Sequence, residues 1–200
     1  MDKPTKYLEY AASGRIAGGT FDSREALDAA FSTPLNFSVD HYRQKLHVFC
    51  PYFMGLASAY ESPRVAELLS GNGTFLDLAR ADLPGCTTHY VSDSPNSVGL
   101  FRHLYGEHPP HELVTDISGG LYDIVLSDAS LNLMDGPQVE RFVSVAPERV
   151  APGGSLCLLV NMSPGELRED FDLSAIHRNL SLSLTCVYGM NTFCSVWLKP

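Results

Sequence analysis

The sequence predicts an α/β protein in which a seven-stranded, mostly parallel sheet has helices on both faces, a terminal antiparallel hairpin and a helical segment in front of it. Three patterns predict this class. Apolar residues recur at helical spacing up to about Pro63, short apolar runs then alternate with helical stretches, and the last two apolar runs are joined by a very short connection. We therefore divide the chain into an N-terminal helical segment, residues 1–62, and an α/β domain, residues 63–200.

Length and charge agree with one such domain plus a modest additional segment. The chain has 200 residues, and a domain holds roughly 150. There are 14 Lys and Arg against 23 Asp and Glu, which gives a formal charge of −9. An acidic protein lacks the positive field that attracts the phosphate backbone, so nucleic acid is a disfavoured partner.

No export signal or membrane span is visible. The charged first residues are not followed by an apolar stretch, and nowhere do about 18 apolar residues run without interruption. We expect a cytoplasmic protein without a membrane segment. The 5 cysteines are odd in number and form no CxxC pair, and the 7 histidines show no metal-binding helical spacing. Reduced thiols and no metal site are therefore expected.

The N-terminal segment contains two helical stretches. Residues 23–31 begin with a serine that suits a helix N-cap, and residues 40–60 carry apolar side chains at helical intervals on both sides of Pro51. Proline at this point breaks or kinks the helix. For most of this apolar face, packing is a better explanation than a binding surface.

Seven short apolar runs predict the strands. The first five are spaced for a parallel sheet, and the last two are separated only by Gly189-Met190-Asn191-Thr192, which indicates an antiparallel hairpin. The predicted strands are residues 65–69, 88–91, 112–115, 122–126, 155–160, 180–188 and 193–198, and the predicted helices are residues 74–81, 95–105 and 137–150.

A glycine-containing turn follows the first strand. The strand runs into Gly71-Asn72-Gly73 and then into a predicted helix, so the backbone turns tightly and a ligand can approach the amides at the helix start. A turn without a ligand explains this pattern equally well.

The second predicted strand is followed by Asp93, twenty positions after Gly73. At the carboxyl edge of a neighbouring parallel strand, a carboxylate can accept hydrogen bonds from both hydroxyls of a ribose. Asp93 or Ser94 also suits the N-cap of the helix that begins at Pro95. The two roles are compatible.

Acidic residues also mark the ends of other strands. Asp116 follows the third predicted strand, Asp128 follows the fourth, and Glu67 lies near the end of the first. Ligands of open α/β sheets bind outside the carboxyl ends of the strands, so these residues and Asp93 form one candidate site.

In this order the motifs resemble those of class I S-adenosylmethionine-dependent methyltransferases, over about residues 64–200. Glu67, Gly71 and Gly73 are similar to the first motif of that family, with Leu69 in place of its earliest glycine. The resemblance implies a Rossmann-like fold and S-adenosylmethionine as the cofactor. The cofactor-binding residues that it implies are Glu67, Leu69, Ser70, Gly71, Asn72, Gly73, Asp93, Ser94, Asp116, Ile117 and Asp128.

The resemblance also assigns a role to each later segment. The Asp93 segment looks like the ribose-binding acidic loop. Asp116 is placed toward the exocyclic amine of adenine, and the amide of Ile117 is placed toward the ring. The segment that ends at Asp128 resembles the fourth-strand motif beside the transferable methyl group.

The implied activity is methyl transfer to a small-molecule acceptor, with segment 1–62 as lid and acceptor wall. Asp128-Ala129-Ser130-Leu131 differs from the Asn/Asp-Pro-Pro-Tyr/Phe sequence that nitrogen methyltransferases of bases and amides use. This difference disfavours methylation of adenine or glutamine and favours a small-molecule acceptor, for which we expect O- or C-methylation. Candidate acceptor-binding residues are Tyr42, Tyr52 and Asn132. His47 is the candidate general base, although an ordinary packing or surface role explains this residue better.

Two other functions stay open. A non-catalytic protein of the same fold, which binds a partner or the cofactor without turnover, is favoured by Leu69 and by the lack of an obvious base. An enzyme of NAD or of a nucleotide sugar is disfavoured by the terminal hairpin and the imperfect glycine pattern. The sequence is compatible with a homodimer.

Overall fold

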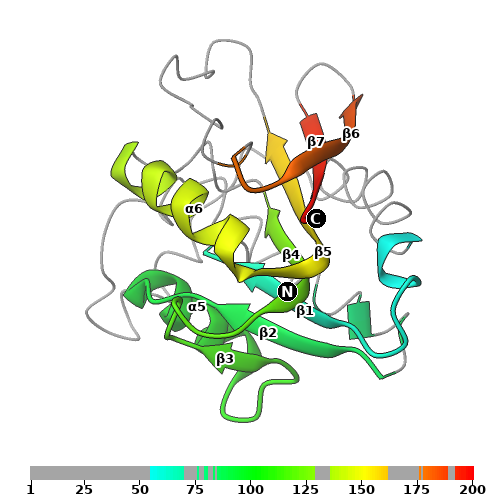
Figure 1. The fold of residues 1–200 in the computed structure, drawn as a ribbon. Helices are drawn as coiled ribbons and strands as arrows, with labels where there is room; N and C mark the ends of the chain where they lie inside the picture. Colours follow the sequence, from blue (N-terminus) through cyan, green and yellow to red (C-terminus); the bar gives the residue numbers. More distant parts are fainter. Residues whose placement is uncertain are drawn as a thin grey trace.

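A computed structural model gives the architecture (Figure 1). It describes residues 55–69, 76, 79–80, 83, 85–128, 136–161, 176, 178–188 and 192–200. The strands within these residues are β1 (Arg64–Leu68), β2 (Thr87–Val91), β3 (Glu112–Val114), β4 (Tyr122–Asp128), β5 (Val150–Asn161), β6 (Ser181–Tyr188) and β7 (Thr192–Leu198). The longer helices are α5 (Pro95–Tyr105) and α6 (Gly136–Arg149).

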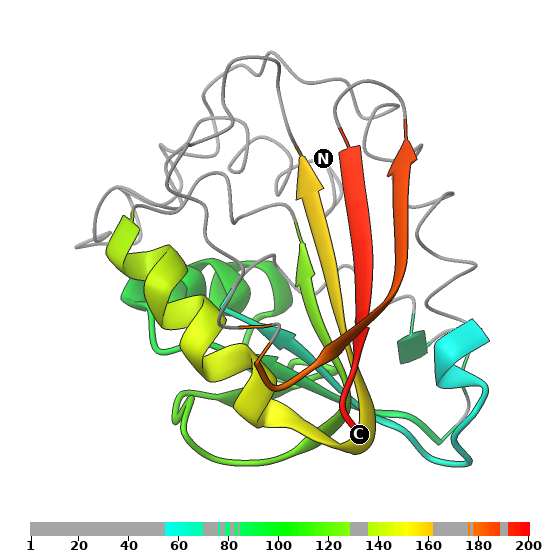
Figure 2. The same cartoon turned by 45° about the horizontal axis from the view of Figure 1, so that its top comes forward.

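The strands form one seven-stranded sheet in the order β3-β2-β1-β4-β5-β7-β6. β1 pairs in parallel with β2 and β4, β2 pairs in parallel with β3, and β4 pairs in parallel with β5. β7 lies between β5 and β6 and is antiparallel to both, as the red and orange arrows of Figure 2 show. The expected mostly parallel sheet with a terminal hairpin is confirmed. The structure adds that β7, and not β6, is the neighbour of β5.

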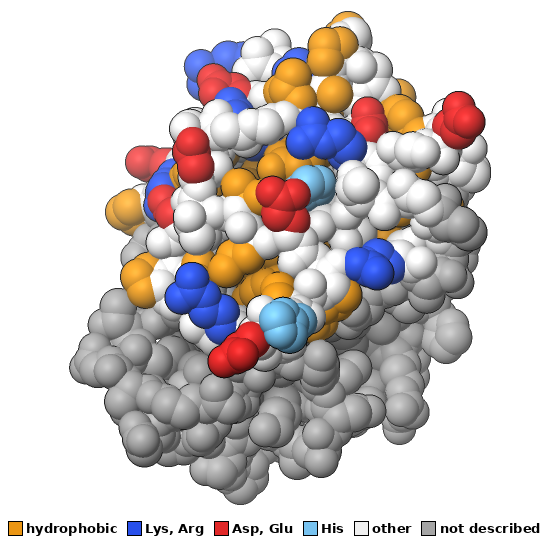
Figure 3. All heavy atoms as spheres, turned by 90° about the horizontal axis from the view of Figure 1, so that it is seen from below, with side chains coloured by type: hydrophobic (Ala, Val, Ile, Leu, Met, Phe, Trp, Pro, Cys, Tyr) orange, Lys and Arg blue, Asp and Glu red, His pale blue; other side chains and the backbone are white. Residues whose placement is uncertain are grey.

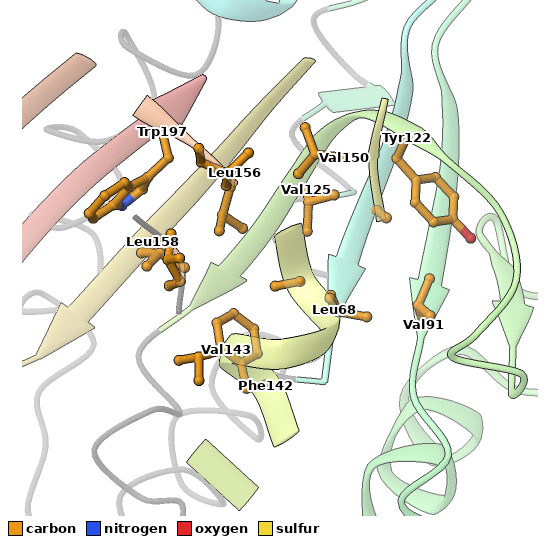
Figure 4. Close-up of a cluster of buried hydrophobic side chains, with 14 residues drawn as sticks. Leu68, Val91, Tyr122, Val125, Phe142, Val143, Val150, Leu156, Leu158 and Trp197 are labelled. Carbon is orange, nitrogen blue, oxygen red and sulfur yellow. The ribbon is translucent and has the colours of Figure 1, made fainter. Parts of the chain in front are cut away.

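One face of the sheet is covered by α6. Phe142 is fully buried and Val143 is nearly so, in a cluster that includes Leu68 and Leu158 of the strands. Figure 4 shows the two helix side chains directed toward these strand residues. The apolar residues of α6 recur at helical spacing, so one side of the helix packs on the sheet while the other side meets solvent.

The opposite face is covered by α5. Phe101 of this helix is fully buried and stacks on Tyr90 of β2, with ring centroids 4.6 Å apart. Successive side chains of a strand point to opposite faces, so Tyr90 meets α5 while its neighbour Val91 belongs to the cluster under α6. The predicted helices on both faces are confirmed.

The start of β5 differs from the prediction. Val150 already pairs with Tyr122, and an irregularity then brings Ser155 opposite Ile124, so the strand begins at Val150 and not at residue 155. Gly154 lies within this irregularity, where an added Cβ would come within 2.8 Å of the Asp123 carbonyl oxygen. The absence of a side chain at Gly154 therefore allows β4 and β5 to approach closely.

The connection from β3 to β4 contains no helix. Residues 115–121 cross from one strand to the other as a turn, a bend and irregular chain. Arg149, the last residue of α6, donates from Nη1 to the Ser118 carbonyl and, at 3.4 Å, to the Gly120 carbonyl. The end of α6 thus holds this connection in place.

Three further predictions concern the N-terminal lid, a membrane segment and a basic patch. Of the predicted helical lid, residues 1–62, only residues 55–62 are described, and the rest of the lid lies outside the described residues. No helix in the described ranges is long and apolar enough to cross a membrane. On the face seen in Figure 3, the described acidic and basic side chains are interspersed, so this face presents no basic patch among those residues.

Candidate functional site

The carboxyl ends of β1, β2 and β3 stop at the same level. Leu68 pairs with Val91, and Val91 pairs with Val114, so the residues that follow these strands emerge at one edge of the sheet. β4 reaches the same edge, because Glu67 pairs with Leu126, two residues before the end of that strand. This register brings to one edge the segments that carry Leu69, Asp93, Asp116 and Asp128, as expected for ligand sites of open α/β sheets.

Leu69 turns the chain at the end of β1. Its φ is +53°, and it is the one non-glycine residue with a positive φ among those described. Its amide donates to the Val91 carbonyl at 2.8 Å, and its side chain packs against the core on the α6 face. The left-handed region is costly for a residue with a Cβ. The backbone at this position therefore has a conformation that is usually adopted by glycine.

Two groups of predicted site residues lie outside the described residues. The first is the glycine turn, which comprises Ser70, Gly71, Asn72 and Gly73. The second comprises the acceptor candidates Tyr42, Tyr52 and Asn132 together with the candidate base His47. The described part of the site therefore consists of the strand ends and of α5 and α6.

After β2, the role of helix N-cap and the role of carboxylate at the sheet edge fall to two different residues. Ser94 is the N-cap of α5, because its Oγ accepts a hydrogen bond from the Ser97 amide at 3.5 Å and Pro95 begins the helix. Asp93 does not take this part. Its Oδ2 accepts a hydrogen bond from Nη2 of Arg141 on α6, and its side chain is 32% exposed. The carboxylate of Asp93 is thus presented at the sheet edge.

Asp116, after β3, closes a turn of its own. Its Oδ1 accepts hydrogen bonds from the Ser118 amide at 2.9 Å and from the Ser118 hydroxyl at 2.5 Å. These bonds, helped by the charge of Arg149, hold the pKa of Asp116 below its usual value. The carboxylate is exposed, and Ile117 packs partly buried against the core. The roles of both residues toward adenine stay predictions.

The two central strands bring polar groups close to this edge. Glu67 is 1% exposed and lies between Tyr90 on β2 and Leu126 on β4. Ser127 precedes Asp128, the predicted site residue at the end of β4. Ser127 is 2% exposed, and its Oγ has no hydrogen-bond partner among the described residues. A buried hydroxyl without a partner is costly. Nothing in the sequence marks Ser127, because its burial arises only when the sheet forms.

Two arginines of α6 contact the segments that follow β2 and β3, although no sequence pattern marks them. Arg141 reaches Asp93, 48 residues earlier in the chain, and Arg149 reaches Ser118, 31 residues earlier. They are eight residues apart, which corresponds to about 12 Å along a helix. Only the packing of α6 on the sheet brings each arginine to its partner.

The described residues suit a ligand that carries a ribose. Asp93 offers a charged acceptor that is not used as a helix cap, at the edge where β1 turns, and charge-assisted hydrogen bonds to hydroxyls are among the stronger ones. By contrast, no group of three or more His, Cys, Asp or Glu in the described ranges could hold a metal ion. Cys86 and Cys157 are free cysteines.

Comparison with models of protein families gives no match, and comparison with curated proteins gives none either. Solved structures do match. The N-methyltransferase NodS from Bradyrhizobium japonicum, in complex with S-adenosyl-L-homocysteine, is 14% identical with a TM-score of 0.58, over 97% of this chain and 99% of that chain. The PH0226 protein from Pyrococcus horikoshii is 13% identical with a TM-score of 0.61, over 80% and 91%. A TehB-like SAM-dependent methyltransferase from Corynebacterium glutamicum is 14% identical with a TM-score of 0.54, over 79% and 100%.

These similarities show that the chain has the fold of class I S-adenosylmethionine-dependent methyltransferases. The resemblance of the sequence motifs is confirmed at the level of the fold. Which residues bind the cofactor, and which acceptor is methylated, are questions about the site itself.

Proposed function

We propose that this protein is an S-adenosylmethionine-dependent methyltransferase that acts at an oxygen or carbon atom of a small-molecule acceptor. The observation that carries the proposal is the place of Asp93 in a sheet of this fold. It follows β2, beside the turn made by Leu69 after β1, and it leaves the capping of α5 to Ser94. A carboxylate in this position suits the two hydroxyls of a ribose.

The proposed cofactor site extends along the edge from Asp93. The turn after β1 approaches the methionine part, Asp116 and the Ile117 amide face adenine, and the end of β4 flanks the methyl group. The full set is Glu67, Leu69, Ser70, Gly71, Asn72, Gly73, Asp93, Ser94, Asp116, Ile117 and Asp128. The cofactor supplies an electrophilic methyl group when bound.

The remaining task of the chain is to align the acceptor with that methyl group and to exclude water. We assign the acceptor wall to segment 1–62, with Tyr42 and Tyr52, and to Asn132 after β4. An oxygen nucleophile also needs a base, for which His47 is the candidate. The charge of −9 supports a small-molecule acceptor over nucleic acid. We place the enzyme in the cytoplasm and consider a homodimer compatible with it.

A non-catalytic protein of this fold is the second candidate. Leu69 favours it, because a branched side chain stands at the left-handed position where the backbone would otherwise approach the ligand. Such a protein would bind the cofactor or a partner without turnover.

Isothermal titration with S-adenosylmethionine, S-adenosylhomocysteine and NAD tests the proposal. We expect both sulfur nucleosides to bind and NAD not to bind. At 100 times the dissociation constant, a ligand stabilises the fold by about 2.7 kcal/mol, which a thermal melt detects as a higher Tm. Binding without methyl transfer to any of a panel of small hydroxylated acceptors would favour the non-catalytic candidate. The absence of a Tm shift with either sulfur nucleoside at millimolar concentration would reject the cofactor assignment.

A further inference from the structure

The two arginines of α6 connect this helix to both acidic segments of the proposed nucleoside site. Arg141 donates to Oδ2 of Asp93. Arg149 donates to the carbonyl of Ser118, whose amide and hydroxyl in turn donate to Asp116. The carboxylates proposed for the ribose and for adenine are therefore both tied to α6, one directly and one through a turn.

α6 is a rigid support for these contacts. Phe142 and Ala146 are fully buried and Val143 is 6% exposed, so the rotation of the helix about its axis is set by packing on the sheet. Arg141 immediately precedes Phe142. Its backbone is therefore held in place, and its side chain extends from a fixed point to Asp93.

Folding stability does not account for this ion pair. The side chains of Arg141 and Asp93 are 50% and 32% exposed. Exposed ion pairs contribute little to the free energy of folding, because water screens the charges and two long side chains lose freedom. The pair uses Oδ2, and no hydrogen bond from the described residues reaches Oδ1 of Asp93.

We propose that Arg141 is a positioning residue for the nucleoside cofactor. By holding Oδ2, it sets the rotamer of Asp93 before the ligand arrives and leaves Oδ1, which can accept two hydrogen bonds, open to the ribose hydroxyls. The freedom of the carboxylate is then already lost in the unbound protein, so less conformational entropy is lost on binding. This inference rests on the proposed function, since the ribose is that of S-adenosylmethionine or its product.

The test is a double-mutant cycle on the dissociation constant of S-adenosylhomocysteine. Isothermal titration is carried out on the wild type, Arg141→Ala, Asp93→Asn and the double variant. We expect Arg141→Ala to weaken binding by roughly 3- to 10-fold. In the Asp93→Asn background the same change should have little further effect, because Arg141 acts through the carboxylate. Arg141→Lys should recover part of the affinity, since it keeps the charge without the planar fork.

Arg102→Ala is the matched control. Arg102 is an exposed arginine of α5 without an ion pair in the described ranges, so its removal should leave the dissociation constant unchanged. Urea midpoints close to that of the wild type would show that the variants are folded. If Arg141 had a purely structural role, its removal would lower the urea midpoint together with the affinity. A loss of affinity at an unchanged urea midpoint therefore indicates a role in binding.

Three results would overturn the inference. Unchanged or tighter binding by Arg141→Ala, with a wild type that binds, removes the positioning role and leaves the proposed function intact. Additive losses in the cycle show that Arg141 does not act through Asp93. A wild type that does not bind S-adenosylhomocysteine overturns the proposed function and this inference with it, so the wild-type titration tells the two failures apart.

Discussion

The amide of Leu69 donates to the carbonyl oxygen of Val91 at 2.8 Å, so the left-handed residue that follows β1 is tied to the last residue of β2. This bond sets the point at which the chain leaves β1, next to the point at which Asp93 leaves β2. The left-handed φ of Leu69 thus accompanies the hydrogen bond that joins the ends of β1 and β2. The leucine side chain is tolerated there at a cost in backbone strain.

Substitutions of Leu69 should reverse the usual order of glycine and alanine. In a strand or helix, glycine is less stable than alanine by roughly 0.5–1 kcal/mol. At a φ of +53°, alanine keeps the left-handed strain that glycine removes. We expect the Leu69→Gly variant to be more stable than the Leu69→Ala variant, with a free energy of unfolding in urea that is higher by about 1 kcal/mol. If alanine proves the more stable, the backbone in solution does not hold this conformation.

Asp93→Ala should affect ligand binding more than folding. The loss in free energy of S-adenosylhomocysteine binding should be about 2–4 kcal/mol, because charge-assisted hydrogen bonds contribute roughly 1.5–3 kcal/mol each and are not additive. Folding should change little, since Ser94 caps α5 and the ion pair with Arg141 is exposed. Titration and urea unfolding measure the two effects, and near-wild-type affinity would remove Asp93 from the site.

Ser94→Ala provides the contrast on the adjacent residue. The Oγ of Ser94 accepts from the Ser97 amide at the start of α5. Loss of an N-cap lowers the free energy of unfolding by about 1 kcal/mol. We expect this decrease in urea unfolding for Ser94→Ala and a smaller one for Asp93→Ala. The opposite order would show that Asp93 supports the helix in solution.

Stability should decrease as the pH falls below about 6.5, because of His89. Burial lowers the pKa of His89, and the charge of Arg64 lowers it further, while Glu112 opposes these effects. Its Nδ1 lies 3.1 Å from Oε2 of Glu112, and its Nε2 is buried and has no hydrogen-bond partner within the described ranges. In the unfolded chain the pKa is about 6.5, so the unfolded state takes up the proton first. The contribution of His89 is therefore complete above that pH and is lost as the pH falls toward the lowered pKa of the folded state.

Urea unfolding of the wild type and of His89→Gln checks this prediction. It is measured between about pH 7.5 and pH 5, which is roughly the range in which a histidine titrates. The variant should lack the decrease in this range. Both proteins should still lose stability at lower pH, where carboxylates such as Asp116, whose pKa is also lowered, become protonated. An equal slope in the two proteins would assign the effect to other groups.

Two buried serines should respond oppositely to alanine. Ser127→Ala removes a hydroxyl that has no hydrogen-bond partner in the part of the chain that the structure describes, so the free energy of unfolding should rise by up to about 1 kcal/mol. Ser195→Ala removes the acceptor of the Trp197 indole N–H, which is 2.9 Å away and buried, and should cost about 1–3 kcal/mol. Thermal or urea unfolding of both variants gives the comparison. Clear destabilisation by Ser127→Ala would mean that its hydroxyl has a partner in solution.

Much of the fold follows from local patterns in the sequence. α5 occupies residues 95–105 as predicted, because a capping serine, a proline at the first position and apolar residues at helical spacing all lie within the helix or beside it. The strands were found to within a few residues, since a parallel sheet covered on both faces requires apolar runs. The hairpin of β6 and β7 followed from its short connection, because few residues can join two strands only in antiparallel fashion.

Other features depended on contacts between distant parts of the chain. A hairpin can join a sheet through either of its strands, so the placement of β7 beside β5 required the packed sheet. The sequence placed an acidic residue and a serine before α5, but the hydrogen bond from Ser97 decided that Ser94 is the cap. The pairing of Asp93 with Arg141 spans 48 residues, and an ion pair over such a separation leaves no periodic or local signal. The ion pair forms because the buried side of α6 packs on the sheet and so places the exposed Arg141 within reach of Asp93. Only tertiary packing decides this placement.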